Sequence, residues 1–317
     1  MYKLPILILT YNRPEQLSRL VNQIKKIRPM KVYVGCDGPK NNFDRFQIKK
    51  IKNILNSFDK KTKLFKKFYK KNKGIKLSVQ SSISWFFKNE KMGLILEDDC
   101  IPKLIFFQYM KHLLFKYKNN KKIYAISGYN PFGKTKFGSG TYFASNFFLC
   151  WGWGSWRRSW RSSYKKIDYF VRNPDKYLSL KLKNTTQARF WKKMINRVHN
   201  GFITSWAILF LFSAWRNNAF ILLPNINMID NVGFNQSATT SPGLNYKTAK
   251  SFDYKKKIKD PPILQIDKKN EQLVFNKTFN PHSFLYPGRF LYLIKYLLFN
   301  PKLFFFKIKI YIKNYIK

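Results

Sequence analysis

LPILILTYNRPEQL, residues 4–17, decides the fold class. Its apolar run at 4–10 predicts a strand that is buried on both faces of a sheet. The capping residue Asn12 and the proline at position 14 predict that a helix begins there. KVYVGC at 31–36 predicts the next strand. A strand, a helix and a second strand in this order indicate a parallel pairing.

The same alternation continues along the chain. Predicted helices separate three further predicted strands, which are LFKKFY at 64–69, MGLIL at 92–96 and IYAIS at 123–127. This pattern predicts an α/β fold, with a mostly parallel, Rossmann-like sheet flanked by helices. In such sheets, ligands gather at the carboxyl ends of the strands.

The rest of the chain has a different composition. Gly, Ser and aromatic residues dominate from about residue 138, and WAILFLFSAW at 206–215 indicates a buried helix too short to span a membrane. The Lys-, Pro- and Asn-rich segment 241–283 predicts extended chain. Residues 284–317 form a basic amphipathic extension, which suits either an anionic membrane surface or packing on the core.

The net charge narrows the choice of partners. Lys and Arg total 61 against 15 Asp and Glu, which gives +46 over 317 residues. A field of this sign attracts polyanions such as nucleic acid, anionic lipid and phosphorylated sugars. A bias towards A/T-rich codons explains part of the excess equally well. The lysines are spread over the chain instead of forming a binding module, so we expect no nucleic-acid partner, although a basic nucleic-acid-binding protein is the main alternative class.

The three cysteines and the N-terminus indicate a cytoplasmic protein. Cys36, Cys100 and Cys150 lack the spacing of a disulfide framework or of a zinc cluster. The sequence begins MYKLPILILT, without the basic start, long apolar stretch and cleavage site of a signal peptide.

The strongest chemical signal is LILEDDCIP at 94–102. An apolar strand brings Glu97, Asp98 and Asp99 together, and crowded carboxylates raise one another's pKa. A divalent cation removes that cost because it prefers hard oxygen ligands. The triplet therefore predicts a metal site at a strand end. The alternative is a surface turn whose acids pair with lysines.

A second acid, Asp37, follows the predicted strand at 31–36, where an acid in a dinucleotide-binding fold would hold a ribose. However, the turn from Thr10 to Pro14 contains no glycine-rich phosphate loop, which argues against a dinucleotide-dependent oxidoreductase. The three histidines are scattered without the spacing of metal ligands, at positions 112, 199 and 282.

Several motifs occur together in one order: PILILTYNRPEQL, Asp37, NKGIKLSVQSSISWFF, LILEDDCIP, ISGYNPFG and CWGWGSWRRSW. With these motifs in this order, the chain resembles the family 2 type of glycosyltransferase with the GT-A fold. It is most similar to bacterial surface-polysaccharide transferases that are distantly like N-acetylglucosaminyltransferase I. The resemblance covers roughly residues 4–235.

The resemblance implies a catalytic domain over residues 1–240, with a nucleotide-sugar half at 1–130 and an acceptor half at 131–240. It implies that an inverting enzyme moves a sugar from a nucleotide-diphosphate donor, by preference a UDP-sugar, to a glycan or lipid-linked acceptor. Such an enzyme would work at the inner face of the cytoplasmic membrane, in surface polysaccharide synthesis.

The same resemblance assigns roles on the donor side. It implies that the nucleotide pocket is lined by Thr10, Asn12 and Arg13, that Asp37 contacts the base or the ribose, and that Lys76 meets phosphate. It further implies that Glu97 and Asp98 face the ribose and the donor sugar. Asp99 would ligate the Mg²⁺ or Mn²⁺ ion that bridges the diphosphate.

The acceptor side is less complete. Trp151 and Trp153, with Gly152 between them, could offer flat faces to sugar rings, or the indoles could belong to the core. Trp206 lies where many relatives have a neighbouring carboxylate, which this chain lacks, and no histidine follows near Thr240.

Inverting transfer requires a base to deprotonate the acceptor hydroxyl. Asp230 and Asp168 are the candidates in the second half, and Glu97 ranks behind them because its surroundings already serve the donor. A non-catalytic, sugar-binding relative is a third possible function.

Overall fold

A computed structural model describes residues 1–163, 167–182, 184–233, 248–253 and 257–279. The predicted amphipathic extension, 284–317, lies outside the described residues. Within the described part of the chain, no helix is both long and apolar enough to cross a bilayer. All three cysteines are described and none forms a disulfide.

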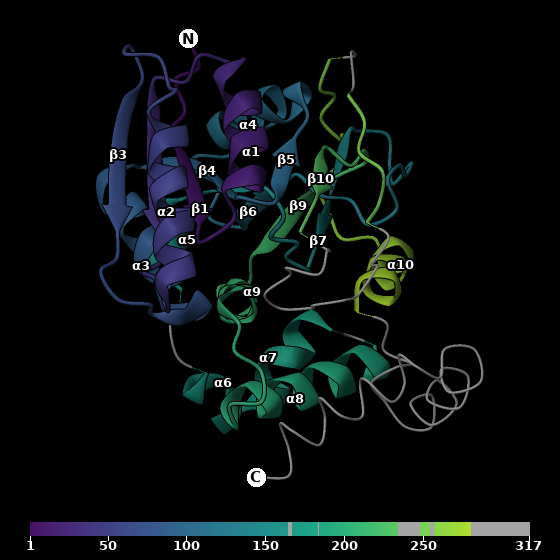
Figure 1. The fold of residues 1–317 in the computed structure, drawn as a ribbon. Coiled ribbons are helices and arrows are strands. Elements are labelled where there is room, and N and C mark those ends of the chain that lie inside the picture. Colours follow the sequence, from purple (N-terminus) through teal and green to yellow (C-terminus); the bar gives the residue numbers. More distant parts are fainter. Residues whose placement is uncertain (164–166, 183, 234–247, 254–256, 280–317) are drawn as a thin grey trace, which may run out of the picture.

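The first half alternates strands and helices as the sequence predicts (Figure 1). Its elements are β1 (Ile6–Thr10), α1 (Pro14–Lys25), β2 (Lys31–Cys36), α2 (Asn42–Leu55), β3 (Lys63–Phe68), α3 (Gly74–Asn89), β4 (Met92–Glu97), β5 (Cys100–Pro102), α4 (Leu104–Lys116) and β6 (Ile123–Ser127).

The second half adds further strands and a group of helices. These elements are β7 (Tyr142–Ser145), β8 (Trp153–Trp156), α5 (Arg157–Arg161), α6 (Asp168–Arg172), α7 (Pro174–Lys181), α8 (Thr185–His199), α9 (Trp206–Arg216), β9 (Phe220–Pro224), β10 (Ile229–Asn231) and α10 (Lys268–Phe279).

The central sheet has eight strands in the order β3-β2-β1-β4-β8-β6-β9-β7. Its first four strands are parallel, β8 runs antiparallel to both β4 and β6, and β9 is parallel to β6. The predicted α/β class with a mostly parallel sheet is therefore confirmed. The order β3-β2-β1-β4 is that of the first four strands of a doubly wound nucleotide-binding fold.

Helices cover both faces of this sheet, which explains why the first four residues of β1 are all apolar. Leu7 and Leu9 belong to the hydrophobic cluster on the α3 and α9 side, whereas Ile6 and Ile8 belong to the cluster on the α1, α2 and α4 side. Successive residues of a strand point to opposite faces, so a strand between two helix layers needs apolar residues at every position.

Two local predictions need correction. Asn12 does not cap α1, because the N-cap is Arg13, without a side-chain bond, and the Asn12 amide binds Asp44 instead. The segment 241–283, predicted to be extended, contains helix α10. Val274 and Phe275 of this helix are completely buried, which anchors it to the main body. WAILFLFSAW does form the predicted buried helix, α9.

Candidate functional site

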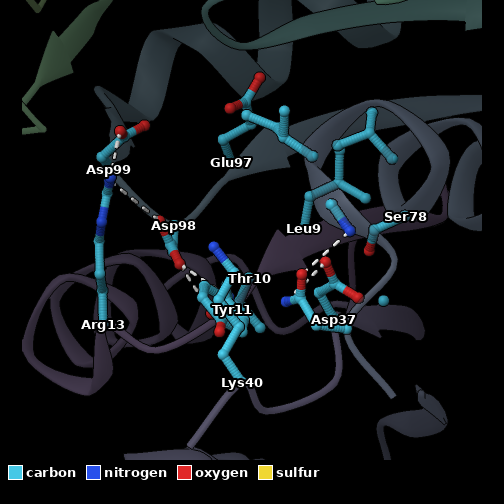
Figure 2. A pocket seen from close by; sticks show the side chains of 15 residues that line it. Leu9, Thr10, Tyr11, Arg13, Asp37, Lys40, Ser78, Glu97, Asp98 and Asp99 are labelled. Carbon is cyan, nitrogen blue, oxygen red and sulfur yellow. Dashed lines mark hydrogen bonds and ion pairs between the residues drawn. The ribbon is translucent and has the colours of Figure 1, made fainter. Parts of the chain in front are cut away.

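A pocket opens where β1, β2 and β4 end and α3 begins (Figure 2). Parallel strands place their carboxyl ends at one edge of the sheet, and the turns that follow them form this pocket. It is lined by Leu9, Thr10, Tyr11, Arg13, Gly35, Asp37, Lys40, Asn72, Gly74, Ile75, Ser78, Val79, Glu97, Asp98 and Asp99.

Asp98 joins the end of β4 to the turn after β1. Its backbone N–H donates to the Leu9 carbonyl at 2.9 Å. Its carboxylate Oδ2 accepts from Thr10 Oγ1 at 2.8 Å and from the Tyr11 N–H at 3.3 Å. Asp98 is buried. We infer that this carboxylate fixes the shape of the turn as well as contributing charge to the pocket.

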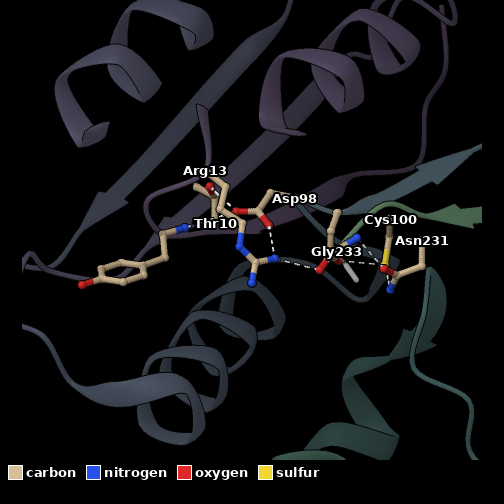
Figure 3. A network of polar contacts seen from close by, with 8 residues as sticks. Thr10, Arg13, Asp98, Cys100, Asn231 and Gly233 are labelled. Atoms are coloured by element: carbon tan, nitrogen blue, oxygen red, sulfur yellow. Dashed lines mark hydrogen bonds and ion pairs between the residues drawn. The ribbon is translucent and has the colours of Figure 1, made fainter. Parts of the chain in front are cut away.

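Asp99 is held from three sides, by Arg13, Cys100 and Gly233, which belong to the polar network of Figure 3. Arg13 Nη1 donates to its Oδ2 at 2.9 Å and also lies 3.8 Å from Asp98 Oδ1. The Cys100 thiol donates to Oδ1 at 3.5 Å. Gly233 packs so closely that a Cβ there would lie 2.1 Å from Oδ2. A side chain at position 233 would force the Asp99 carboxylate out of this orientation.

Glu97 completes the acidic triplet at the last position of β4. Burial, together with the charges of Asp99 and Asp98, raises the pKa of Glu97. Burial and the charge of Asp99 raise the pKa of Asp98, while Arg13 acts in the opposite direction on both. The predicted crowding of these carboxylates is therefore present, and a bound cation would relieve it.

Asp37 forms the opposite wall of the pocket at the end of β2. Its Oδ1 accepts from the backbone N–H groups of Gly38, at 2.8 Å, and Lys73, at 2.9 Å. Its Oδ2 accepts from Asn72 Nδ2 at 3.2 Å. One oxygen is thus saturated by the backbone, and the other keeps capacity to accept from a ligand hydroxyl.

Asp44 is a residue that the sequence reasoning missed. It is buried in the first turn of α2 and accepts from Tyr11 Oη at 2.5 Å, from Asn12 Nδ2 at 2.8 Å and from the Lys40 N–H at 2.9 Å. Burial alone would raise its pKa, but the hydrogen bonds from Tyr11 and Asn12 and that from the Lys40 backbone lower it. The only sequence signal for this role was an acid in the first turn of a predicted helix. Such an acid is also explained locally, because it interacts favourably with the helix dipole.

The predicted donor-side residues divide into two groups. The pocket brings together Thr10, Arg13, Asp37 and the acidic triplet, and it adds Tyr11 and Lys40, which the sequence reasoning did not select. Asn12 and Lys76 are not among its lining residues. Asn12 instead supports the turn after β1 through its hydrogen bond to Asp44.

The predicted sugar-stacking tryptophans lie mainly in the core. Trp153 is 1% exposed and stacks on Trp206 with ring centroids 5.6 Å apart, so neither indole presents an open face. Trp151 is half-buried against Tyr129, at 4.4 Å between ring centroids. Gly152 has φ +60, and a Cβ there would lie 2.4 Å from the Ile229 side chain. Trp153 and Trp206 therefore belong to the hydrophobic core, which was the alternative to a role in sugar stacking.

The two predicted bases lie outside the pocket lining. Asp230 Oδ2 pairs with Lys103 Nζ at 2.9 Å, and its Oδ1 accepts from Ser251 Oγ at 2.5 Å. Asp168 begins α6, is 61% exposed at its side chain and lies 3.8 Å from His199 Nδ1.

The oxygens of the triplet suit Mg²⁺ or Mn²⁺, which prefer carboxylate ligands. Among the described residues, however, no three His, Cys, Asp or Glu side chains are arranged so that they alone could hold a metal ion. Arg13 supplies the cation that contacts Asp99 in this structure. These residues fit a metal only if it is shared with oxygens of a bound diphosphate.

No protein-family model and no curated protein matches the sequence. Among solved structures, the chain is similar to UDP-glucose pyrophosphorylase complexed with UDP-glucose, at 9% identity over 72% of this chain and 92% of that one, with a TM-score of 0.38. It is also similar to HddC from Yersinia pseudotuberculosis, at 9% identity over 51% and 81% of the two chains, with a TM-score of 0.33. A third is 4-diphosphocytidyl-2C-methyl-D-erythritolsynthase from Anaerococcus prevotii DSM 20548, at 11% identity over 68% and 99%, with a TM-score of 0.32. Similarity at this level assigns no activity, so the function is argued from the pocket.

Proposed function

We propose that this chain is an inverting glycosyltransferase that uses a nucleotide-diphosphate sugar, by preference a UDP-sugar. The acceptor would be a glycan or a lipid-linked sugar in bacterial surface polysaccharide synthesis. The observation that carries the proposal is the pocket itself, in which Asp37 faces the acidic triplet across the ends of three parallel strands, with Arg13 and Lys40 beside them.

In this proposal, Asp37 binds the ribose. Its Oδ1 is oriented by two backbone N–H groups, and its Oδ2 can accept from a sugar hydroxyl. A carboxylate held from behind in this way loses little rotamer entropy when a ligand binds. Tyr11, also in the lining, offers an aromatic ring beside the same space.

The diphosphate would lie near Arg13, Lys40 and Asp99. Transfer of the sugar leaves negative charge on the departing nucleoside diphosphate, and fixed positive charges stabilise it. A divalent ion, when bound by Asp99 and the diphosphate, supplies further charge neutralisation. Arg13 already lies against Asp99 and Asp98, so its guanidinium is positioned before the donor arrives.

Glu97 is our preferred base for the acceptor hydroxyl. It lines the pocket, whereas Asp230 and Asp168 do not, and a base must come within hydrogen-bond reach of the proton that it removes. The sequence analysis ranked Glu97 behind Asp230 and Asp168, because it assigned the acidic triplet to donor binding. Asp230 and Asp168 would need the acceptor to approach from elsewhere.

A thermal-shift screen of nucleotide sugars, each with Mn²⁺ and with a chelator, tests the donor site. We expect one nucleotide class to raise Tm, with a larger effect when Mn²⁺ is present. Asp37→Ala should abolish the shift, and Asp99→Ala should abolish its Mn²⁺ dependence. Asp175→Ala is the matched control, because its side chain is 76% exposed on α7.

Activity assays separate the remaining alternatives. Glu97→Gln should keep the donor-induced shift but lower transfer by about a hundredfold or more, as is typical when a general base is lost. Donor binding without transfer or hydrolysis by the unmodified chain would indicate the non-catalytic, sugar-binding relative. Salt-dependent binding of nucleic acid that exceeds any nucleotide-sugar binding would favour the competing class.

Peripheral attachment to the cytoplasmic membrane is part of the same proposal and rests on the sequence of residues 284–317 alone. Co-sedimentation with anionic vesicles, compared between the full chain and one ending at residue 283, tests it. Equal sedimentation of the two chains would remove the membrane from the proposal.

A further inference from the structure

A second cavity in the structure has a volume of about 630 Å³. Its walls come from α4, from the segment 134–141 that leads into β7, and from the segment 224–228, which begins with the last residue of β9. It shares no lining residue with the pocket around Asp37. Cavities of roughly 300–1,000 Å³ are typical of small-molecule sites.

The inner surface of this cavity is apolar. Ile105 and Tyr109 of α4 lie beside Met228, and all three are at most 7% exposed. Ile226 and Ile258, both half-buried, continue the same surface. The Tyr109 hydroxyl is buried and has no hydrogen-bond partner within the described part of the chain. A ligand that covers this surface gains by removing apolar area from water.

Two lysines on the segment 134–141 add positive charge to the cavity lining. Lys134 and Lys136 are both exposed, and among the described residues neither pairs with a carboxylate. Lys134 Nζ lies 4.0 Å from the centroid of the Phe252 ring, a contact that attracts the ammonium without neutralising its net charge. The cavity therefore combines an apolar interior with unneutralised cations.

The acids next to the cavity already have partners. Asp253 Oδ1 accepts from the Ile105 N–H at 3.3 Å. Asp260 accepts from Lys116 Nζ at 2.5 Å and from Tyr142 Oη at 2.6 Å, and it pairs with His112 at 3.0 Å. Asp260 is therefore paired with other cations, and among the described residues neither acid forms an ion pair with Lys134 or Lys136.

Hydrogen bonds between Thr141 and Lys259 hold one wall of the cavity in place. The Thr141 N–H donates to the Lys259 carbonyl at 2.8 Å, and the Lys259 N–H donates to Thr141 Oγ1 at 3.2 Å. Together with the bonds of Asp260, they fix Ile258 against the cavity. A site whose walls are fixed in advance binds without a large ordering cost.

We propose that this cavity binds a small amphipathic anion, with its apolar body on the Ile105, Tyr109 and Met228 surface and its phosphate or carboxylate at Lys134 and Lys136. An apolar interior with a few charged groups at one side selects a ligand that carries both features. This inference does not rest on the glycosyltransferase proposal, because the two pockets share no residue.

Isothermal titration with decyl phosphate, below its micelle concentration, tests the inference. We expect saturable binding of one molecule, and affinity that falls about three- to fourfold for each methylene removed in the octyl and hexyl phosphates. Decanoate, compared with decyl phosphate, identifies which anionic group is preferred. Inorganic phosphate and decanol should each bind at least about tenfold more weakly than decyl phosphate.

Variants connect the binding to this cavity. Lys134→Ala with Lys136→Ala should weaken decyl phosphate by about tenfold or more while leaving decanol unchanged. Lys121→Ala, an exposed lysine that does not line the cavity, is the control. Equal binding of decyltrimethylammonium, or an unchanged affinity in the double variant, would overturn the proposal. An affinity independent of chain length would overturn it as well.

Discussion

At the scale of single residues, Asp44 supports the pocket without lining it. Its carboxylate carries the bonds from Tyr11, Asn12 and the Lys40 backbone, and both Tyr11 and Lys40 line the pocket. Asp44→Ala should lower the free energy of unfolding by about 3 kcal/mol, because three part-buried hydrogen bonds lose their charged acceptor. The same variant should weaken nucleotide-induced thermal shifts. Urea unfolding and the thermal-shift assay measure the two effects.

Asp59→Ala serves as the matched control for Asp44. Asp59 is exposed and its side chain bonds only the nearby Lys61 N–H among the described residues. We expect both measurements to stay close to those of the unmodified chain. Unchanged nucleotide binding in Asp44→Ala would show that the turn keeps its shape without this carboxylate.

Single residues also show what the sequence could and could not predict. Asp37 and the triplet meet because parallel strands end at the same edge of a sheet, which the strand pattern already implies. The environment of Trp153 depends on contacts with the nearby Phe148 and with Trp206 and Phe210, which come from a distant part of the chain. No local pattern distinguishes such an indole from one that faces a sugar.

At the scale of elements, α3 approaches β2 most tightly where Ser82 lies against Gly35. A Cβ at Gly35 would lie 2.3 Å from Ser82 Oγ and 2.5 Å from Ser82 Cβ. Gly35→Ala should therefore lower the free energy of unfolding by about 1–3 kcal/mol through overpacking. Adding Ser82→Gly should restore much of this loss, despite its own cost of about 1 kcal/mol in a helix. Urea unfolding of the four chains gives the coupling energy.

Ser82→Ala discriminates between the two atoms of the contact. It removes Oγ but keeps the Cβ, so the pair of Gly35→Ala with Ser82→Ala should stay strained. Additive effects in the cycle with Ser82→Gly would mean that the helix shifts away from the strand instead of clashing with it.

Helices and strands could be predicted where one hydrophobic pattern dominates the sequence of the element. β2 has the predicted bounds, because a short apolar run ends at the turn after Cys36. The antiparallel insertion of β8 between β4 and β6 depends on pairing over long sequence separations, which local patterns do not encode. Helix α10 was missed because its polar residues hide the few positions that become buried.

At the scale of the whole molecule, Glu271 joins α10 to the edge of the sheet. It is 6% exposed and accepts from Ser145 Oγ at 2.8 Å and from the Asn146 N–H at 2.7 Å. Burial raises its pKa from 4.5 to about 7, although these hydrogen bonds lower it in part. Between those values the folded chain keeps a proton that the unfolded chain releases. Stability should therefore fall, by up to about 3 kcal/mol, as the pH rises from about 4.5 to 7.

Urea unfolding across this pH range measures the effect. Glu271→Gln keeps the shape and cannot ionise, so it should remove the corresponding part of the pH dependence and be the more stable chain at pH 7. Glu15→Gln, at an exposed position of α1, should leave the profile unchanged. Parallel profiles for the unmodified chain and Glu271→Gln would refute the raised pKa.

The pairing of β5 with β10 has a consequence for biosynthesis. Asp99 rests on backbone from residues 231–233, which the ribosome adds more than a hundred residues later. The order of synthesis therefore delays completion of the acidic pocket until the second half of the chain has emerged. A chain that terminates prematurely before residue 229 has every carboxylate of the triplet, yet it lacks the strand that positions Asp99.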